Sequence, residues 1–310
     1  MIKKVLTKIQ IYIRLKMKRT LIIGTRSSKL AIWQALYVKS FLLDNFSDIA
    51  VEIIEIQTTG DKNLHDSIGS FGGKGIVLKE IEDALLSKEI DLAVHSYKDV
   101  PTEIPPGLEI IAASNREDPR DVLVSRDNIA LSEFSENSKI GTGSLRRTEQ
   151  LKALKADIKV VPIRGNVDTR INKVFSKEYD GVVLAYAGIK RLDLEQNISQ
   201  IFSVEEIVPS PLQGFVAVEA MQDTDLAKYF HNFSDEKSLI ISNYERRFLK
   251  DLELNCDFPA GFCFEIFKDK FRFNYFLKGS KKTIKEAVEF NYSDLNKNYS
   301  EMLKKLLPAI

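Results

Sequence analysis

The chain has 310 residues, which is enough for two or three domains with hydrophobic cores of their own. Its 45 Lys and Arg residues balance 44 Asp and Glu residues to a net charge of +1, so bulk electrostatics give no reason to expect a nucleic acid or an anionic membrane as partner. Two cysteines and three scattered histidines exclude a disulfide framework and show no metal-ligand spacing. We therefore expect a cytoplasmic protein without structural zinc, in which any anion-binding site is local.

The N-terminal segment, residues 1–19, carries seven basic side chains and no acidic one. It lacks the apolar core of a secretory signal and the serine content of an organellar transit peptide, and no stretch of the chain approaches the roughly 20 apolar residues of a membrane span. We interpret the segment as a leader that is disordered or that precedes the true start.

The first elements form a β-loop-α unit. Residues 20–24 (TLIIG) predict a buried strand, and Ser27 or Ser28 can cap the helix that follows. A second strand, 51–58, leads into a long Gly-rich connection of the kind that is usually functional or mobile. The helix is expected to carry its apolar face on Leu30, Trp33, Tyr37 and Phe41.

The stretch 94–107 (VHSYKDVPTEIPPG) is the first candidate site. A helix over 76–88, with Val77, Ile81, Ala84 and Leu85 facing inward, and a strand over 90–94 precede it. Polar side chains at the carboxyl end of a strand, followed here by a proline-stiffened loop, are where an open α/β sheet places its site. Asp99 is the candidate catalytic carboxylate, and a solvated Lys98–Asp99 pair is the alternative.

After a strand over 108–113, the β/α alternation restarts from about residue 115. It predicts helices from 144 and over 166–175, with strands over 121–125, 139–141, 158–163 and 181–185. Two such sets favour an α/β fold of two similar lobes with a cleft between them. Prolines 209 and 211 mark a break, after which a strand over 214–219 can return to the first lobe.

The last third predicts a small α+β domain. It contains a helix over 236–252, two aromatic-rich strands around a KDK turn, and a helix near 295–306. The expected domains are the leader (1–19), domain 1 (20–114 and 215–232), domain 2 (115–214) and domain 3 (233–310).

Five arginines at strand-to-helix junctions predict an anion site. In GTGSLRR (141–147), two glycines with Thr142 and Ser144 form the turn, and Arg146 and Arg147 follow in the first helical turn. Free backbone N–H groups and the helix dipole attract an anion there, and arginine adds a forked donor. Each arginine alone can equally be a surface residue beside a carboxylate, but their shared placement favours a cationic cleft. The other three are Arg26, Arg164 and Arg170.

Four further residues are candidates for either a structural or a functional role. Lys74, in GGKG, lies outside any phosphate-loop pattern, because Gly75 stands where Ser or Thr would bind magnesium, and it is either an anion contact or a solvated lysine. Cys256 lies on a loop where a thiol can react, whereas Cys263 lies in an apolar strand and is expected in the core. His95 is either structural or an acid-base group.

The motifs together resemble the hydroxymethylbilane synthase, or porphobilinogen deaminase, family over about residues 21–262. They are GTRSSKLAIWQA, GGKG, DLAVHSYKDVPTEIPPG, REDPRDVLVS, IGTGSLRR, IRGNVDTRI, AYAGIKRL and NCDFPAG. The resemblance implies a transferase that joins four porphobilinogen molecules head to tail, with loss of ammonia at each step, to give hydroxymethylbilane for tetrapyrrole (porphyrin, haem) biosynthesis. It implies two periplasmic-binding-protein-like lobes with mixed sheets plus a small α+β C-terminal domain.

The resemblance also implies roles for individual residues. Cys256 would carry a covalent dipyrromethane cofactor, and Asp99, with Lys98 beside it, would be catalytic. Cofactor contacts would come from Arg146, Arg147, Lys74, Ser144 and Thr142, and substrate contacts from Arg26, Ser28, Arg164, Arg170, Ser96 and Gln213. The expected partners are porphobilinogen and oligopyrrole intermediates, with no nucleic acid or membrane, and the protein is expected to be a monomer. The chain departs from common family residues at Ser70, Leu212 and Asn255.

Two alternatives stay open. One is a non-catalytic organic-anion-binding protein of the two-lobed solute-binding fold, which would give Cys256 no function. The other is a relative that keeps the fold but has lost activity. The absence of a recognisable secretory signal counts against the first, and the presence of Asp99, the arginines and Cys256 counts against the second.

Overall fold

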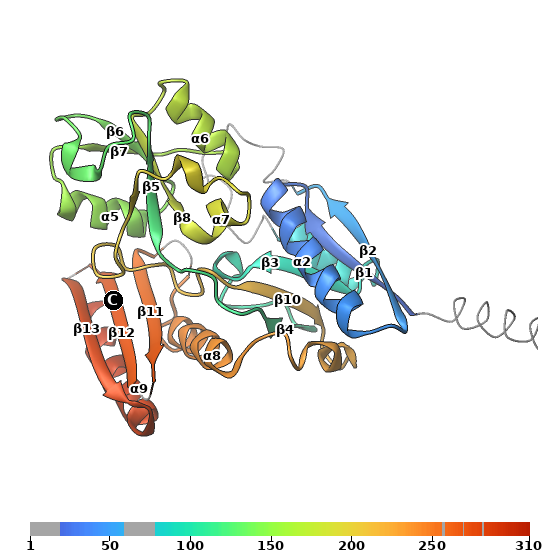
Figure 1. Cartoon of the computed structure of the whole chain (residues 1–310). Coiled ribbons are helices and arrows are strands. Elements are labelled where there is room, and N and C mark those ends of the chain that lie inside the picture. The colour runs from blue at the N-terminus through green and yellow to red at the C-terminus, as the bar shows by residue number, and fades with distance from the viewer. Residues whose placement is uncertain (1–18, 59–77, 256–257, 269, 281) are drawn as a thin grey trace, which may run out of the picture.

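The computed structural model describes residues 19–58, 78–255, 258–268, 270–280 and 282–310, and the fold is given for these. They form two lobes, each built on a five-stranded sheet, and a smaller C-terminal domain with a three-stranded sheet (Figure 1). The predicted α/β class, with two lobes of mixed sheet and a small α+β domain, is confirmed. No helix in the described part of the chain combines the length and apolarity needed to cross a membrane.

Lobe 1 contains a mixed sheet of order β2-β1-β3-β10-β4. β1, β2 and β3 run parallel, whereas β10 lies antiparallel to β3 on one side and to β4 on the other. The strand expected at 214–219 thus returns to this sheet between two strands of the first lobe. The bounds are β1 Arg19–Arg26, β2 Ile49–Ile56, β3 Leu92–Ser96, β4 Leu108–Ala113 and β10 Val216–Met221.

Two helices cover opposite faces of this sheet. Leu21 and Ile23 of β1 point into the core beneath α2 (Lys29–Asn45), and Ile22 points toward the core beneath α4 (Lys79–Leu86). This alternation is the period of two that a strand imposes on its side chains.

The buried face of α2 differs from the prediction. Leu30, Trp33, Tyr37 and Phe41 are only half-buried. The apolar stripe is wider than one row of residues, and the sheet covers the row beside the predicted one. That row consists of Gln34, Ala35, Val38 and Leu42.

Lobe 2 repeats the plan with the order β7-β6-β8-β5-β9. β7, β6 and β8 are parallel, and β5 is antiparallel to β8 and β9. The structure adds β9 and a short helix α7, which were not predicted, and shortens the strand expected over 158–163. The bounds are β5 Asp121–Ser125, β6 Lys139–Gly141, β7 Lys159–Val161, β8 Gly181–Ala185, β9 Gln200–Ile201, α5 Leu145–Leu154, α6 Val167–Phe175 and α7 Tyr186–Lys190.

The C-terminal domain packs an antiparallel sheet against two helices. The strands β11 (Ala260–Phe267), β12 (Lys270–Lys278) and β13 (Thr283–Asn291) pair in chain order, and α8 (Glu236–Asp251) and α9 (Leu295–Leu306) complete the domain. β13 was not predicted. Cys263 lies in the core as predicted, and burial raises the pKa of its thiol.

All three parts meet at one buried ion pair. Arg116, on the segment that crosses from lobe 1 to lobe 2, places Nη1 2.8 Å from Oε1 of Glu245 on α8. Arg116 Nε donates to the carbonyl of Gln213 at 3.0 Å, and the amide of Leu212 donates to Glu245 Oε2 at 2.6 Å. The segments that cross between the lobes are therefore fixed to the C-terminal domain at this point.

Candidate active site

Asp99 is presented by a short, firmly anchored turn. β3 ends at Ser96, and a single 3₁₀ turn, Tyr97–Asp99, follows it. Tyr97 and Val100 are buried in the core shared with the C-terminal domain, whereas Asp99 between them is exposed. Two buried anchors thus hold one exposed carboxylate, which limits its reorganisation during a reaction.

The C-terminal domain ties down the rest of the Asp99 loop. Arg246 on α8 donates to the carbonyls of Val100, Pro101 and Thr102. The hydroxyl of Thr102 donates to the carbonyl of Leu254 at 2.7 Å. Leu254 precedes the predicted cofactor cysteine by two residues, so the described chain next to that cysteine contacts the loop that carries Asp99. Cys256 and Lys74 themselves lie outside the described residues.

Lys98 points toward lobe 2. Its Nζ donates to Oε1 of Gln213 at 3.0 Å. Burial, together with the nearby Arg147, lowers the pKa of Lys98 to about 7, against the opposing attraction of Asp99 and Asp121. The amine beside Asp99 is therefore able to gain and lose a proton near neutral pH.

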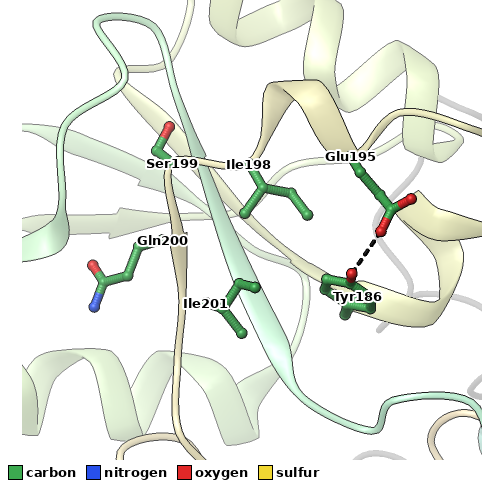
Figure 2. A pocket seen from close by; sticks show the side chains of 6 residues that line it. All are labelled: Tyr186, Glu195, Ile198, Ser199, Gln200 and Ile201. Carbon is green, nitrogen blue, oxygen red and sulfur yellow. Dashed lines mark hydrogen bonds between the residues drawn. The ribbon is translucent and has the colours of Figure 1, made fainter.

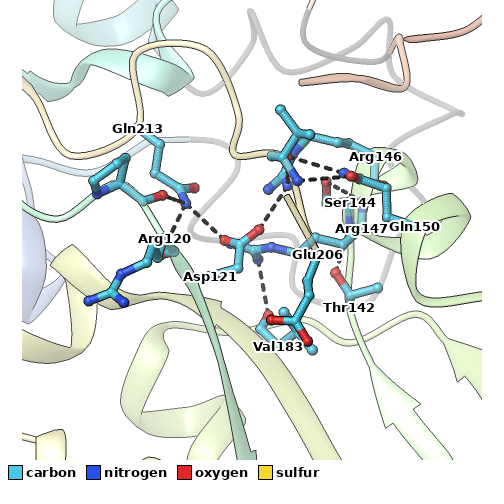
Figure 3. A network of polar contacts seen from close by, with 12 residues as sticks. Arg120, Asp121, Thr142, Ser144, Arg146, Arg147, Gln150, Val183, Glu206 and Gln213 are labelled. Carbon is cyan, nitrogen blue, oxygen red and sulfur yellow. Dashed lines mark hydrogen bonds and ion pairs between the residues drawn. The ribbon is translucent and has the colours of Figure 1, made fainter. Parts of the chain in front are cut away.

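The predicted arginine pair is present but shares a buried counter-ion that the sequence analysis missed. Arg146 Nη1 and Arg147 Nη2 lie 2.8 and 2.6 Å from the two carboxylate oxygens of Asp121, and all three side chains are almost fully buried (Figure 3). Burial by itself raises the pKa of Asp121, but the two guanidinium groups outweigh it and hold this pKa well below its usual range. The pair is thus built around an ionised carboxylate.

One N–H donor of the arginine pair makes no hydrogen bond within the described structure. Arg147 Nε is buried and has no hydrogen-bond partner within the described part of the chain, while its Nη1 donates to the carbonyl of Val183 at 3.0 Å. A buried unpaired N–H is costly, so a group that accepts from it is favoured there.

Arg170 extends the cationic cluster from α6. Its Nε donates to the carbonyl of Gly165 at 2.7 Å. Burial lowers the pKa of Arg170, as does Arg147, whereas Asp99 raises it. Arg164, which is half-buried, also repels Arg170. Arg170 therefore lies within electrostatic reach of the lobe 1 carboxylate and of the lobe 2 arginines.

The hydroxyl groups predicted as ligands have local structural partners. Ser28 caps α2 by accepting from the amide of Ala31 at 3.2 Å, and Ser144 caps α5. Thr142 accepts from the amide of Ser144, and Ser96 bonds the amide group of Gln34 at 2.9 Å. These hydroxyls shape the turns at the strand ends. Arg26, the last residue of β1, lies at the same carboxyl-terminal end of the parallel strands as Ser96, the last residue of β3.

His95 is structural in this fold. Its Nε2 lies 3.0 Å from Oε2 of Glu219 on the neighbouring strand β10, and both side chains are buried. The nearby Glu82 on α4 has its pKa raised to about 7, chiefly by burial and then by Glu219. In the described segments, no group of three or more His, Cys, Asp or Glu side chains is arranged to hold a metal ion.

A surface pocket of about 320 Å³ lies elsewhere on lobe 2 (Figure 2). Tyr186 donates to Glu195 at 2.5 Å on its wall. None of the predicted site residues lines it. The lining residues are Tyr186, Glu195, Ile198, Ser199, Gln200 and Ile201.

The fold and the site together define a two-lobed α/β protein in which a fixed, exposed carboxylate on one lobe is placed near a buried cluster of cationic side chains on the other. Residues 21–228 match the family model for porphobilinogen deaminase, dipyromethane cofactor binding domain. The chain belongs to the porphobilinogen deaminase family.

Individual relatives agree with the family match. The porphobilinogen deaminase of Syntrophomonas wolfei is 47% identical over 243 residues, which cover 78% of this chain and 79% of the relative. That of Caldicellulosiruptor saccharolyticus is 43% identical over 286 residues, or 91% and 98% of the two chains. Among solved structures, the VFT2 domain of Bordetella pertussis BvgS matches with a TM-score of 0.42 and 14% identity, over 73% of this chain and 91% of that domain.

Proposed function

We propose that this chain is a hydroxymethylbilane synthase: a transferase that condenses four porphobilinogen molecules head to tail, with loss of ammonia, in tetrapyrrole biosynthesis. Its cofactor is dipyrromethane, attached to Cys256. The observation that carries the proposal is the placement of Asp99, exposed on an anchored turn within electrostatic reach of Arg170, and with Lys98 and the lobe 2 arginines close by.

The donors of the site suit a dipyrromethane group. Porphobilinogen and the pyrroles made from it each carry an acetate and a propionate, so the group is a polyanion. Arg147 offers a buried N–H that lacks a partner in the described structure, and Arg170 adds a second guanidinium within electrostatic reach of Arg147. When bound, the cofactor supplies the terminal pyrrole carbon to which the first substrate unit is joined.

Asp99 is the group that we assign to the reacting centre. Loss of ammonia from porphobilinogen leaves a cationic electrophile, and a preorganised carboxylate stabilises positive charge as it develops. The pyrrole N–H groups donate to the same carboxylate oxygens, which orients the ring. Lys98 holds or releases a proton next to this carboxylate, and the arginines hold the side-chain carboxylates of the substrate.

Intact-mass analysis of the purified protein tests the cofactor assignment. Protein from cells that make tetrapyrroles should carry a dipyrrole-sized adduct, which Cys256→Ala should lack. Cys263→Ala is the matched control, because that thiol is buried in the core and the adduct should remain. An unmodified wild-type protein would overturn the proposal and favour the non-catalytic anion-binding alternative.

We further propose that the enzyme works in the cytoplasm as a monomer, on porphobilinogen and oligopyrrole intermediates, without a nucleic acid or a membrane as partner. The near-neutral net charge of +1 supports the absence of a nucleic acid or an anionic membrane as partner. Light scattering of the purified protein over a range of concentrations should give the mass of one chain, and a dimer mass would contradict the proposal.

A further inference from the structure

A chain of polar contacts joins Lys98 in lobe 1 to the arginine pair in lobe 2. Lys98 bonds Gln213, and Gln213 Nε2 donates to Asp121 Oδ1 at 2.8 Å. Asp121 is the shared counter-ion of Arg146 and Arg147 (Figure 3). The chain therefore runs from the turn after β3, through the segment that crosses back from lobe 2, to the start of β5 and the first turn of α5.

The amide of Gln213 can adopt one orientation in this chain. Its Nε2 faces acceptors, namely the carbonyl of Pro119 at 2.6 Å as well as Asp121. A flipped amide would set its oxygen against these oxygens and its NH₂ group against the amine of Lys98. Gln213 is also fully buried, so water cannot compensate for a wrong orientation. Its oxygen is therefore fixed toward Lys98.

The backbone around Gln213 is held equally firmly. Leu212 and Gly214 on either side have φ values of 62° and 97°, in the region that favours glycine. The backbone N–H of Gln213 donates to the carbonyl of Ser210, and the backbone N–H of Leu212 donates to the carboxylate of Glu245. The strain at Leu212 is maintained by its surroundings, which is typical of a segment whose geometry serves a site.

We propose that Gln213 and Asp121 are positioning residues: together they hold the Lys98 amine beside Asp99 and hold the arginine pair in place for a substrate or cofactor carboxylate. This inference rests on the proposed function for its role in turnover, but the positioning itself concerns this chain alone.

The charges around Lys98 define what each change should do. Arg146 and Arg147 on α5 repel its proton, whereas Asp121 on β5 and Asp99 on its own turn attract it. Asp121→Asn removes one attraction and leaves both arginines, so the amine should lose its proton at lower pH. Gln213→Met removes the acceptor and should act in the same direction. Gln213→Glu places a carboxylate at that point and should act in the opposite direction.

The pH dependence of Lys98 labelling by an amine-reactive anhydride measures this directly, since only the neutral amine reacts. The labelled peptide is quantified by mass spectrometry on the intact holoprotein, without porphobilinogen. We expect the midpoint to fall by about 1 pH unit in Asp121→Asn and Gln213→Met, and to rise by a similar amount in Gln213→Glu, as for one nearby charge or charge-assisted bond.

Asp180→Asn is the matched control. Asp180 is a lobe 2 carboxylate that pairs with Arg126. It precedes Gly181, the first residue of β8, whereas Asp121 pairs with Ala185 at the other end of that strand. Its loss should therefore leave the Lys98 midpoint unchanged. Equal midpoints in wild type and in folded Gln213→Met and Gln213→Glu proteins would overturn the inference. If Asp121→Asn does not fold, the opposite shifts of the two Gln213 variants still decide it. A protein without the cofactor adduct or turnover, but with these shifts, would overturn the proposed function and keep the positioning.

Discussion

At the scale of single residues, the candidate site contains one exposed carboxylate, Asp99, and one buried carboxylate, Asp121. Asp99 is exposed and reaches a substrate without desolvating any core group, whereas Asp121 is fully buried and is paired with two arginines. The two carboxylates therefore suit different tasks in the proposed mechanism: Asp99 faces the charge that develops on the substrate, and Asp121 keeps the two arginines in place.

Asp99→Ala should strongly reduce porphobilinogen turnover while the protein stays folded. In the proposed mechanism the carboxylate stabilises developing positive charge, so we expect a loss of roughly 100-fold or more in kcat. The side chain is exposed, so the free energy of unfolding should change by less than about 0.5 kcal/mol. Glu103→Gln, on the same loop and also exposed, is the control for a general charge effect. Near-normal turnover by Asp99→Ala would remove Asp99 from the proposed mechanism.

Lys98→Met should change how stability depends on pH. The pKa of Lys98 is about 7 in the folded protein, against the ordinary lysine value of 10.5 in the unfolded chain, so the unfolded chain binds more protons between these two values. The contribution of Lys98 to stability therefore falls as pH falls from about 10.5 to 7 and stays low below 7. Relative to wild type, Lys98→Met should gain stability as pH falls through this window. Denaturant unfolding at several pH values measures it, and a difference that does not vary with pH would contradict the prediction.

At the scale of elements, glycine positions show where segments approach closely. Gly261 on β11 lies against the segment that crosses back to lobe 1, and a Cβ there would come within 2.7 Å of the carbonyl oxygen of Val208 and 2.9 Å of that of Pro209. Because both neighbours are backbone atoms, they cannot turn aside as a side chain would.

Gly261→Ala should loosen the contact between the C-terminal domain and this segment. We expect a destabilisation of about 1–3 kcal/mol, the usual cost of overpacking. Gly188→Ala in α7 is the control: its Cβ would meet side-chain atoms no closer than 3.6 Å, and alanine is the better helix former. Thermal unfolding of both variants distinguishes overpacking at Gly261 from a general effect of replacing glycine by alanine. Equal stability of the two variants would show that β11 moves to accommodate the added methyl group without loss of stability, which would contradict the prediction.

At the scale of the whole molecule, the lobes and the C-terminal domain share the buried Arg116–Glu245 pair. Glu245 also accepts from the amides of Leu212 and Phe264, so it fixes the returning segment and β11 at once. The position of Gln213, one residue after Leu212, depends on this arrangement.

Arg116→Met should destabilise the protein by about 3–5 kcal/mol, because it leaves a buried carboxylate without its counter-ion. The double variant Arg116→Met, Glu245→Leu should recover part of the loss, since no charge is then left unpaired. A double-mutant cycle from denaturant unfolding measures the coupling. Additive effects of the two single changes would show that the pair does not act as a unit.

The sequence predicted the elements whose patterns are local. Buried strands such as 20–24, and the position of Asp99 just after a strand, follow from apolar runs and prolines, whereas the 3₁₀ turn that presents Asp99 was not predicted. The role of Asp121 could not be predicted, because its arginine partners are brought to it only when β5 pairs with β8 and α5 packs beside them. The only local signal was a charged residue directly before the apolar run of β5. β13 was missed because the charged Glu286 interrupts its apolar face between Ile284 and Val288, while Lys285 and Glu289 lie on the opposite face.

The return of β10 to the lobe 1 sheet also bears on the order in which the chain can fold during synthesis. The strands of the lobe 2 sheet lie within residues 121–201, so that sheet can close as soon as this stretch has left the ribosome. The lobe 1 sheet must wait for β10, which lies between β3 and β4 and is made about a hundred residues after β4. The N-terminal lobe is therefore expected to be the later of the two to mature, and the segment that carries Gln213 reaches its place at that moment.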